Sequence, residues 1–318
     1  MKITMPVSAL KQALTTVLPF RQQRSSALPI LANVRLMAAA GELFLSATNL
    51  EAGITLRTPC TTEEFGATCV HAEALAKIVG MQEGEYVTLE ADHATTYLRI
   101  SSGSYRGKLV TTPDDQFPIV PDVIDEDAFD APTNLVAALS AVAKTASKDE
   151  SRPTLTCIKV TVGDGNLQLV STDGYRLTRV TLPTPTNPET PDLTLLVPVK
   201  TIEALTRIAK GAQSVRLCVT EDKFTAEVAA DDQTAVITCI TMDARFPDYQ
   251  AIIPVTHNSC AKVKASPLVR ATKMALLTGV DANVVGYAFG ADQVAVSAKS
   301  DTQEARIELP ATLAGEPI

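Results

Sequence analysis

The sequence has no tryptophan and few aromatic residues, which make up 4% of its 318 positions. Its three histidines lie far apart, and none has a partner at the spacing of a metal site or of a nucleophile and its base. The six cysteines form no Cys-x-x-Cys pair and lie in or beside apolar stretches, where a free thiol behaves as a small hydrophobic group. These patterns favour neither a metal site nor a disulfide framework, and we expect no cofactor.

The sequence also lacks a long hydrophobic run. No apolar stretch approaches the roughly 20 residues that a membrane-spanning helix needs, and the sequence starts at Met1 without the apolar region of a signal peptide. A hydrophobic content of 46% and a charged content of 20% are typical of a globular protein. We therefore expect a cytoplasmic protein of two or three domains with no membrane partner.

Internal repeats organise the chain around the stretch 167–177, which predicts a strand, a turn and a second strand. Asp173-Gly174 supplies the turn, because glycine adopts a positive φ without a Cβ clash. Thr48-Asn49 precedes Thr172-Asp173 by 124 residues, and Lys299-Ser300 follows it by 127. Repeats of this length exceed those of solenoids and predict tandem domains.

Hydrophobic periodicity predicts that each full repeat has two halves, and that each half is a helix followed by three strands. The expected helices cover 8–18, 71–81, 133–148, 199–210 and 267–278. The expected strands lie near 31–37, 42–48, 53–58, 86–91, 96–101, 106–111, 155–162, 166–172, 175–182, 214–219, 223–229, 234–240, 284–289, 293–299 and 303–309. This pattern predicts an α+β fold with domains at 1–121, 122–254 and 255–318, of which the third is partial.

The charge is distributed unevenly between the helices and the rest of the chain. The net charge is −8, which taken alone argues against nucleic acid as a partner. Yet the five expected helices carry nine of the 28 basic residues and two of the 36 acidic ones, which leaves 19 and 34 elsewhere. The basic nine are Lys11, Lys77, Lys144, Lys148, Lys200, Arg207, Lys210, Arg270 and Lys273. If the helices share one side of the sheets, that side is cationic and suits a phosphate backbone; the alternative is that helices simply favour lysine.

Several motifs, in their order and spacing, resemble the bacterial DNA polymerase III β subunit, the sliding clamp. The matching stretches are Leu28-Pro-Ile-Leu-Ala-Asn33, Ser46-Ala-Thr-Asn-Leu-Glu51, Ser151-Arg-Pro153, Ser171-Thr-Asp-Gly-Tyr-Arg-Leu177, Val197-Pro-Val-Lys200 and Arg245-Phe-Pro-Asp-Tyr249. The pair of motifs Thr-Asp-Gly-x-Arg-Leu and Arg-Phe-Pro-Asp-Tyr is distinctive of that family.

The resemblance implies tandem clamp domains, each with two helices packed on antiparallel sheets, and a ring made by two chains head to tail. Such a clamp encircles duplex DNA without sequence specificity and tethers the replicative polymerase. It is not an enzyme, and DNA polymerase and clamp-loader subunits are its protein partners. Edge strands near 104–110 and 303–309 would form the ring interface.

The family also implies a peptide-binding cleft. Carried over position by position, its wall is formed by Leu155, Thr172, Gly174, Tyr175, Arg176, Leu177, Pro247 and Ile252; for the leucines and Pro247, ordinary core positions are the alternative. The resemblance further places Arg24 and Arg152 in loops that approach DNA. The predicted DNA contacts are then these two arginines and the helix cations Lys77, Lys144, Lys148, Lys200, Arg207, Lys210, Arg270 and Lys273.

The partial third domain leaves a second hypothesis open. A clamp variant without the rest of that domain would bind partner peptides or DNA weakly and form no competent ring. The unmatched half-domain should also expose apolar side chains, with Leu276, Leu277, Ile307 and Leu309 as candidates. An enzyme is the weakest interpretation, because Asp173 beside Arg176 is the only candidate pair and a turn-stabilising role is sufficient for it.

Overall fold

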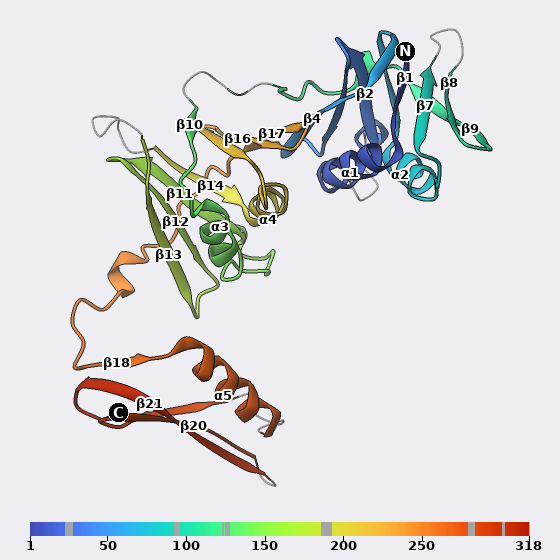
Figure 1. The fold of residues 1–318 in the computed structure, drawn as a ribbon. Coiled ribbons are helices and arrows are strands. Elements are labelled where there is room, and N and C mark those ends of the chain that lie inside the picture. The colour runs from blue at the N-terminus through green and yellow to red at the C-terminus, as the bar shows by residue number, and fades with distance from the viewer. Residues whose placement is uncertain are drawn as a thin grey trace. The chain divides into compact units, whose positions relative to one another are not determined.

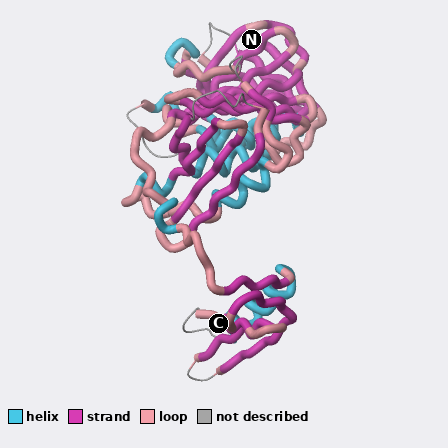
Figure 2. Tube along the Cα trace, turned by 90° about the vertical axis from the view of Figure 1, so that its left-hand side faces the viewer, coloured by secondary structure: helices cyan, strands magenta, loops and turns pink. Residues whose placement is uncertain are grey.

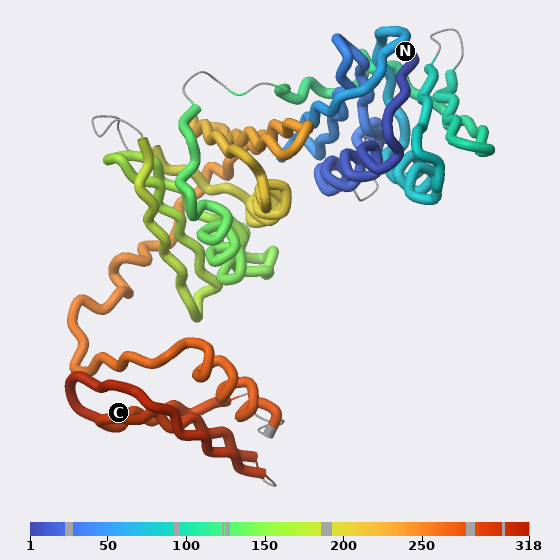
Figure 3. The backbone as a smooth tube through the Cα atoms, viewed as in Figure 1, coloured from blue at the N-terminus to red at the C-terminus, as the bar shows by residue number. Residues whose placement is uncertain are grey.

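The computed structural model describes residues 1–22, 28–91, 96–122, 124, 128–185, 193–278, 284–300 and 303–317. The chain divides into two compact units, Met1–Phe246 and Pro247–Ile318. Each unit is described by itself below, and Figures 1 and 3 trace the order of elements by colour from blue to red.

The first unit begins with two helix-and-strand halves. The first half contains β1 (Lys2–Pro6), α1 (Val7–Val17), β2 (Asn33–Ala39), β3 (Glu42–Thr48), β4 (Ala52–Pro59) and the short β5 (Thr61–Glu64). The second half contains β6 (Gly66–His71), α2 (Ala72–Gly80), β7 (Tyr86–Ala91), β8 (Tyr97–Ser102) and β9 (Tyr105–Thr112).

The same order then repeats in the rest of the first unit. One half has β10 (Phe129–Asp130), α3 (Leu135–Ala143), β11 (Cys157–Gly163), β12 (Asn166–Thr172) and β13 (Leu177–Pro183). The next half has β14 (Leu193–Pro198), α4 (Val199–Ile208), β15 (Ser214–Val219), β16 (Lys223–Ala230) and β17 (Gln233–Ile240).

The second unit is one further half. It contains β18 (Ser259–Val263), α5 (Ala265–Thr278), β19 (Gly286–Phe289), β20 (Gln293–Lys299) and β21 (Glu304–Gly315). Its buried cluster is small and consists of Ala271, Ala275, Val296 and Ala298, with Ile307 and Leu309 packed against it. Leu276 and Leu277 are exposed, as expected, whereas Ile307 and Leu309 are half-buried and their expected exposure was wrong.

A strand precedes every helix. The sequence predicts a linker or a linking strand over 122–132, where β10 lies, and it indicates none of the other four among these five strands. In the first unit each one pairs with the sheet of the neighbouring half, as β1 with β7, β6 with β2, β10 with β15, and β14 with β11. In the second unit β18 pairs instead with the end of β21, from Ser259 with Gly315 to Val263 with Ala311. In the first unit, therefore, each half of a repeat contributes a strand to the sheet of the other half.

One antiparallel contact joins the two repeats of the first unit. β17 pairs with β4 from Thr234 opposite Arg57 to Cys239 opposite Ala52. This contact makes a 13-stranded sheet that runs through both repeats. Figure 2 shows the cyan helices of this unit gathered together beside its magenta strands.

The helices form on apolar stripes at helical spacing and pack in pairs, α1 with α2 and α3 with α4. In α1 the stripe is Leu10, Ala13, Leu14 and Val17, all buried against the sheets. In α4 the buried stripe includes Ile202 and Leu205, both of which are fully buried. Among the described residues no helix is both long enough and apolar enough to span a bilayer.

Helix ends differ from the expected ones, and this changes the charge count. α3 ends at Ala143, because the chain turns there through N–H bonds from Lys144 and Thr145 to carbonyl oxygens of the last turn. Lys144 and Lys148 therefore lie beyond α3, and Lys210 lies beyond α4. The observed helices carry six basic residues, Lys11, Lys77, Lys200, Arg207, Arg270 and Lys273, and two acidic ones, Glu73 and Glu203. The excess of positive charge remains, but it is smaller.

Candidate functional site

The turn between β12 and β13 holds most of the predicted peptide-binding residues in one hydrogen-bonded loop. Thr172 Oγ1 accepts the Gly174 N–H at 3.1 Å and donates to the Arg176 carbonyl oxygen at 2.8 Å. Asp173 Oδ1 accepts the N–H groups of Tyr175 and Arg176, each at 3.0 Å. Gly174 has a φ of +95°, which glycine adopts freely and other residues adopt at a cost of about 1–2 kcal/mol. The side chains of two polar residues thus determine the path of the whole turn.

Arg176 forms an ion pair within this turn and a hydrogen bond to the end of α3. Arg176 Nε donates to Asp173 Oδ2 at 2.9 Å, and Arg176 Nη2 donates to the Lys144 carbonyl oxygen at 3.2 Å. The Arg176 side-chain bond, together with the two backbone N–H bonds, holds the pKa of the Asp173 carboxyl well below its usual range. The pair is therefore fully explained as a structural clamp on the turn.

The 3₁₀ segment Pro153–Thr156 lies beside the same turn. Arg152, which precedes it, places Nη1 3.3 Å from the position that a Cβ on Gly174 would occupy. Its guanidinium is held in place by Asp149 at 2.9 Å. Arg152, predicted as a DNA contact, thus also borders the predicted docking turn.

Apolar side chains near the turn differ sharply in exposure. Leu155 is buried, Leu177 is half-buried, and Tyr175 is 96% exposed. Pro247 and Ile252 belong to the second unit, where Pro247 is exposed and Ile252 is 69% exposed. A cleft wall that joins both groups of residues stays a prediction.

Cationic residues surround a hollow of about 950 Å³ between the ends of α3 and α4 and the turn. Lys144, Lys148, Arg176 and Arg207 line it, together with the acidic Asp173 and Glu203. The remaining predicted DNA contacts are exposed on their own elements: Lys77, Lys200, Lys210, Arg270 and Lys273. Arg24 lies outside the described residues.

Two of these cations already have carboxylate partners. Lys77 pairs with Glu73 at 2.9 Å, and Glu73 also meets Arg21 at 3.3 Å. Lys200 meets Glu150 at 3.5 Å. Their charge is therefore partly neutralised in the free protein, whereas the structure records no ion pair for Lys144, Lys148 or Arg207 among the described residues.

The first repeat contains the same turn between β3 and β4. Thr48 Oγ1 accepts the Leu50 N–H and donates to the Ala52 carbonyl oxygen, each at 3.0 Å. Asn49 Oδ1 accepts the N–H groups of Glu51 and Ala52 at 3.1 and 2.8 Å. Leu50 occupies the place of Gly174 with a φ of +74°.

The turn of the second unit keeps part of this pattern. The Ser300 N–H donates to the Gln303 carbonyl oxygen at 2.8 Å, and the Gln303 N–H donates to Ser300 Oγ at 3.1 Å. The corresponding bonds in the first two turns are made by Asn49 and Asp173. The common bonds support the repeat that the offsets of 124 and 127 predict.

Two family models match the chain. The N-terminal domain of the DNA polymerase III beta subunit matches residues 1–121, and the central domain of the same subunit matches residues 131–248. The beta sliding clamp of Synechococcus elongatus is 27% identical over 299 residues, which cover 91% of this chain and 79% of that protein. The beta sliding clamp of Caulobacter vibrioides is 30% identical over 262 residues, which cover 80% and 68%.

The chain belongs to the bacterial DNA polymerase III beta subunit family. Members of this family are sliding clamps, and the protein is accordingly a DNA polymerase processivity factor. The predicted family and the predicted role as a processivity factor are both confirmed.

Solved clamps share the α+β fold. The Bacillus subtilis sliding clamp superposes with a TM-score of 0.89 at 21% identity, covering 100% of this chain and 86% of that one. A Pseudomonas aeruginosa clamp bound to griselimycin gives a TM-score of 0.87 at 22% identity, with the same coverage. The predicted fold class is therefore confirmed.

Sequence reasoning found the turn but missed two features around it. It matched Asn49 with Asp173, yet it did not foresee that Leu50 adopts the positive φ of Gly174, because a leucine gives no such signal. It also assigned Lys144 and Lys148 to a helix. Thr145 and Ser147 are weak helix formers and are the local signal that could have shortened α3.

Proposed function

We propose that two copies of this chain form a head-to-tail ring that encircles duplex DNA without reading its sequence. The observation that carries the proposal is the junction of β17 with β4, where one repeat continues the sheet of another by antiparallel backbone pairing. A second copy can extend the sheet in the same manner at a free strand edge. We propose domain limits of 1–121, 122–254 and 255–318 for this clamp.

Charge complementarity favours β9 and β21 as the joined edges. Arg106 and Lys108 are exposed on β9. Glu304, Arg306 and Glu308 are exposed on β21, where Arg306 pairs with Glu308 at 3.1 Å. Among the described residues, β9 pairs along Tyr105–Val110 with β8 only, and β21 pairs along Glu304–Pro310 with β20 only. Each strand thus has a free backbone edge, and the net charge along it is positive on β9 and negative on β21, which favours this pairing over like-charged edges.

The exposed cations support a weak, sequence-independent contact with DNA phosphates. Lys144, Lys148 and Arg207 are the strongest candidates, because no ion pair is recorded for them among the described residues. Few aromatic residues are present, so base stacking has little basis. A ring needs only weak contacts, since steric closure and not affinity keeps it on DNA.

The turn at Thr172–Leu177 is the proposed docking point for peptides of DNA polymerase and clamp-loader subunits. Leu155, Leu177, Pro247 and Ile252 would supply apolar area, and Tyr175, in the same turn as Leu177, projects into solvent. A groove next to a rigid turn suits an extended peptide. In this function the protein is non-catalytic and acts in the cytoplasm.

Charge reversal tests the ring. The double variant Arg106→Glu with Lys108→Glu should convert a dimer into a monomer in light scattering at micromolar concentration. A mixture of that variant with Glu304→Lys and Glu308→Lys should dimerise again, because opposite charges are restored across the edge. Arg179→Glu on β13 is the matched control and should leave the dimer intact. A wild-type chain that is strictly monomeric would favour the alternative of a clamp variant without a competent ring.

Topology on DNA gives a second test. The protein loaded on a nicked circular duplex should be retained through gel filtration at high salt and be released when the circle is cut. Equal loss from circular and linear DNA would contradict encirclement, while leaving peptide docking to be tested separately.

A further inference from the structure

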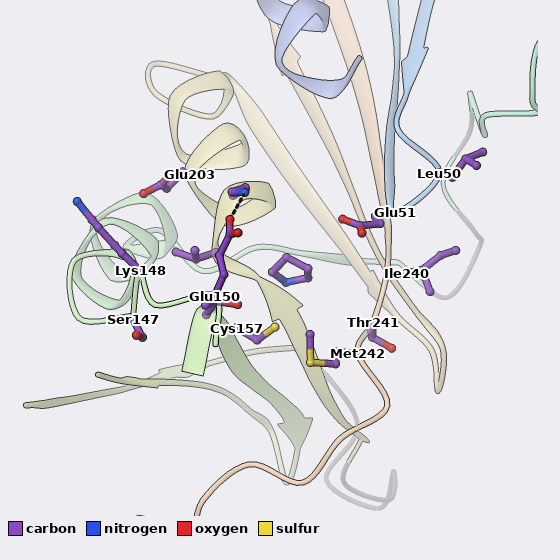
Figure 4. A pocket seen from close by; sticks show the side chains of 14 residues that line it. Leu50, Glu51, Ser147, Lys148, Glu150, Cys157, Glu203, Ile240, Thr241 and Met242 are labelled. Carbon is purple, nitrogen blue, oxygen red and sulfur yellow. Dashed lines mark hydrogen bonds and ion pairs between the residues drawn. The ribbon is translucent and has the colours of Figure 1, made fainter. Parts of the chain in front are cut away.

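A pocket of about 610 Å³ lies at the seam where the first repeat meets the second, wholly within the first unit. The β3–β4 turn supplies Leu50 and Glu51, and the end of β17 supplies Ile240, Thr241 and Met242. The rest of the wall comes from the start of β11, the loop after α3 and the first turns of α4. In Figure 4, Leu50 and Glu51 lie on one side, Lys148 and Glu203 lie on the other, and Cys157 and Met242 lie between them.

The walls of this seam pocket are fixed by backbone bonds. The Ile240 N–H donates to the Glu51 carbonyl oxygen, and the Met242 N–H donates to the Leu196 carbonyl oxygen, both at 2.9 Å. Cys157 is fully buried, and burial raises the pKa of its thiol, so this part of the wall is uncharged at neutral pH. The pocket is therefore preformed and apolar at its base.

Leu50 is placed in the rim of the pocket at a conformational cost. A non-glycine residue at a φ of +74° loses about 1–2 kcal/mol, and the corresponding position in the second repeat is Gly174. Leu50 does not recover this cost through core packing, since its side chain is 48% exposed. Ile240 across the rim is 57% exposed. Strain and exposed apolar groups together are typical of a ligand site.

The rim of the seam pocket is slightly negative. Glu150 is neutralised by Lys200, which lies 3.5 Å away. The structure records no ion pair for Glu51, Glu203 or Lys148 in the described part of the chain. Two carboxylates and one ammonium remain, and this balance favours a cationic group on the occupant.

A second hollow adjoins the seam pocket. It measures about 490 Å³, shares Glu51, Glu150, Pro198 and Lys200 with the seam pocket, and is also lined by Phe20 and by Arg21, which pairs with Glu73. Two adjoining hollows fit an extended chain better than a compact molecule.

We propose that the seam pocket binds a short extended peptide that inserts a leucine-like side chain among Leu50, Ile240 and Met242 and places a basic residue beside Glu51. This site is separate from the turn at Thr172–Leu177, and it does not depend on the ring.

Methionine-methyl NMR on the full chain tests this proposal. The probe is acetyl-Gly-Leu-Lys-Leu-Gly-amide, and its matched control carries glutamate in place of lysine. The Met242 methyl signal should shift in a saturable way with the lysine peptide and respond more weakly to the glutamate peptide. Met81 is 82% exposed on another element and should not move. A Met242 signal that stays unchanged up to millimolar peptide, or equal responses to both peptides, would overturn the proposal.

Variants locate the site. Leu50→Gly keeps the turn foldable, because it places at φ +74° the residue found in the other turn, and it should weaken binding about tenfold by removing the apolar rim. Glu51→Gln should lower the preference for the lysine peptide about threefold. Tyr175→Ala, in the other turn, should change neither value. Unaltered peptide affinity in Leu50→Gly would refute the assignment. A loss of affinity in Tyr175→Ala would instead assign the peptide site to the other turn.

Discussion

The turns at Thr48–Ala52 and Thr172–Arg176 have the same hydrogen bonds and different surroundings. In both, a threonine hydroxyl and an Asn or Asp oxygen accept the same backbone N–H groups. The first is built into a junction, since β4 beside it pairs with β17. The second borders β13, which pairs only with β12 among the described residues. A shared local structure has thus been placed in one seam between repeats and on one open sheet edge.

The residue at positive φ marks this difference. Gly174 leaves the second turn bare, with Tyr175 projecting beside it, whereas Leu50 adds an apolar side chain to the seam. Breaking the hydrogen bonds should affect the two turns alike. Changing the residue at positive φ should affect their stability unequally.

The largest effect is expected from Gly174→Val. A β-branched residue at φ +95° is strongly disfavoured, and its Cβ would lie 3.3 Å from Arg152 Nη1, so we expect a loss of about 2 kcal/mol or more in unfolding free energy. Leu50→Gly, the reciprocal control, should stay within about 1 kcal/mol of the wild type. Urea denaturation followed by circular dichroism measures both. If both variants lost the same unfolding free energy, a side chain at position 174 would cost no more backbone strain than the one at position 50.

Removing the threonine hydroxyls comes next. Thr172→Val and Thr48→Val each leave one backbone N–H of the turn without its partner and remove one of the two bonds to a carbonyl oxygen, which costs about 1–2 kcal/mol. Similar losses in the same denaturation experiment would confirm that the two turns are equivalent. The matching serine variants keep the hydroxyl and should lose less.

A smaller effect is expected on the stability of the protein at acidic pH. The folded-state pKa of Asp173 is lowered, chiefly by Arg176, so its contribution to stability is complete above the unfolded pKa of about 3.9 and is lost as the pH falls below that value. Asp173→Asn should therefore flatten the fall in melting temperature between about pH 4 and pH 2. Asn49, its neutral counterpart, does not titrate, so Asn49→Ala should leave that slope unchanged.

The smallest stability effect is expected at Tyr175. Tyr175→Ala removes a side chain that is 96% exposed and should change the unfolding free energy by less than about 0.5 kcal/mol. It should still lower the affinity for polymerase-derived peptides, measured by fluorescence anisotropy. Leu177→Ala and Ile252→Ala should do the same. Unchanged affinity in all three variants would contradict the docking turn.

Sequence reasoning reached the parts of the fold that depend on near neighbours. The order of the helices and the Asp173-Gly174 turn follow from side chains within a few residues, and the structure has both, although α3 and α4 end earlier than expected. Four of the five strands that precede the helices were not found. β1 and β6 gain their stability from strands in another half of the repeat, and nothing in their short local pattern indicates that pairing.

The sequence by itself determined the family, the repeat and the chemistry of each turn, because the threonine and the Asn or Asp that shape a turn lie within four residues of the groups they bind. The tertiary structure decided which turn lies in a seam and which borders an open edge. That choice depends on β17 meeting β4, from Thr234 opposite Arg57 onward, and backbone pairing across such a distance leaves no mark on local sequence. The pocket that Leu50 lines follows from this long-range contact, whereas the positive φ of Leu50 belongs to the local turn that both repeats share.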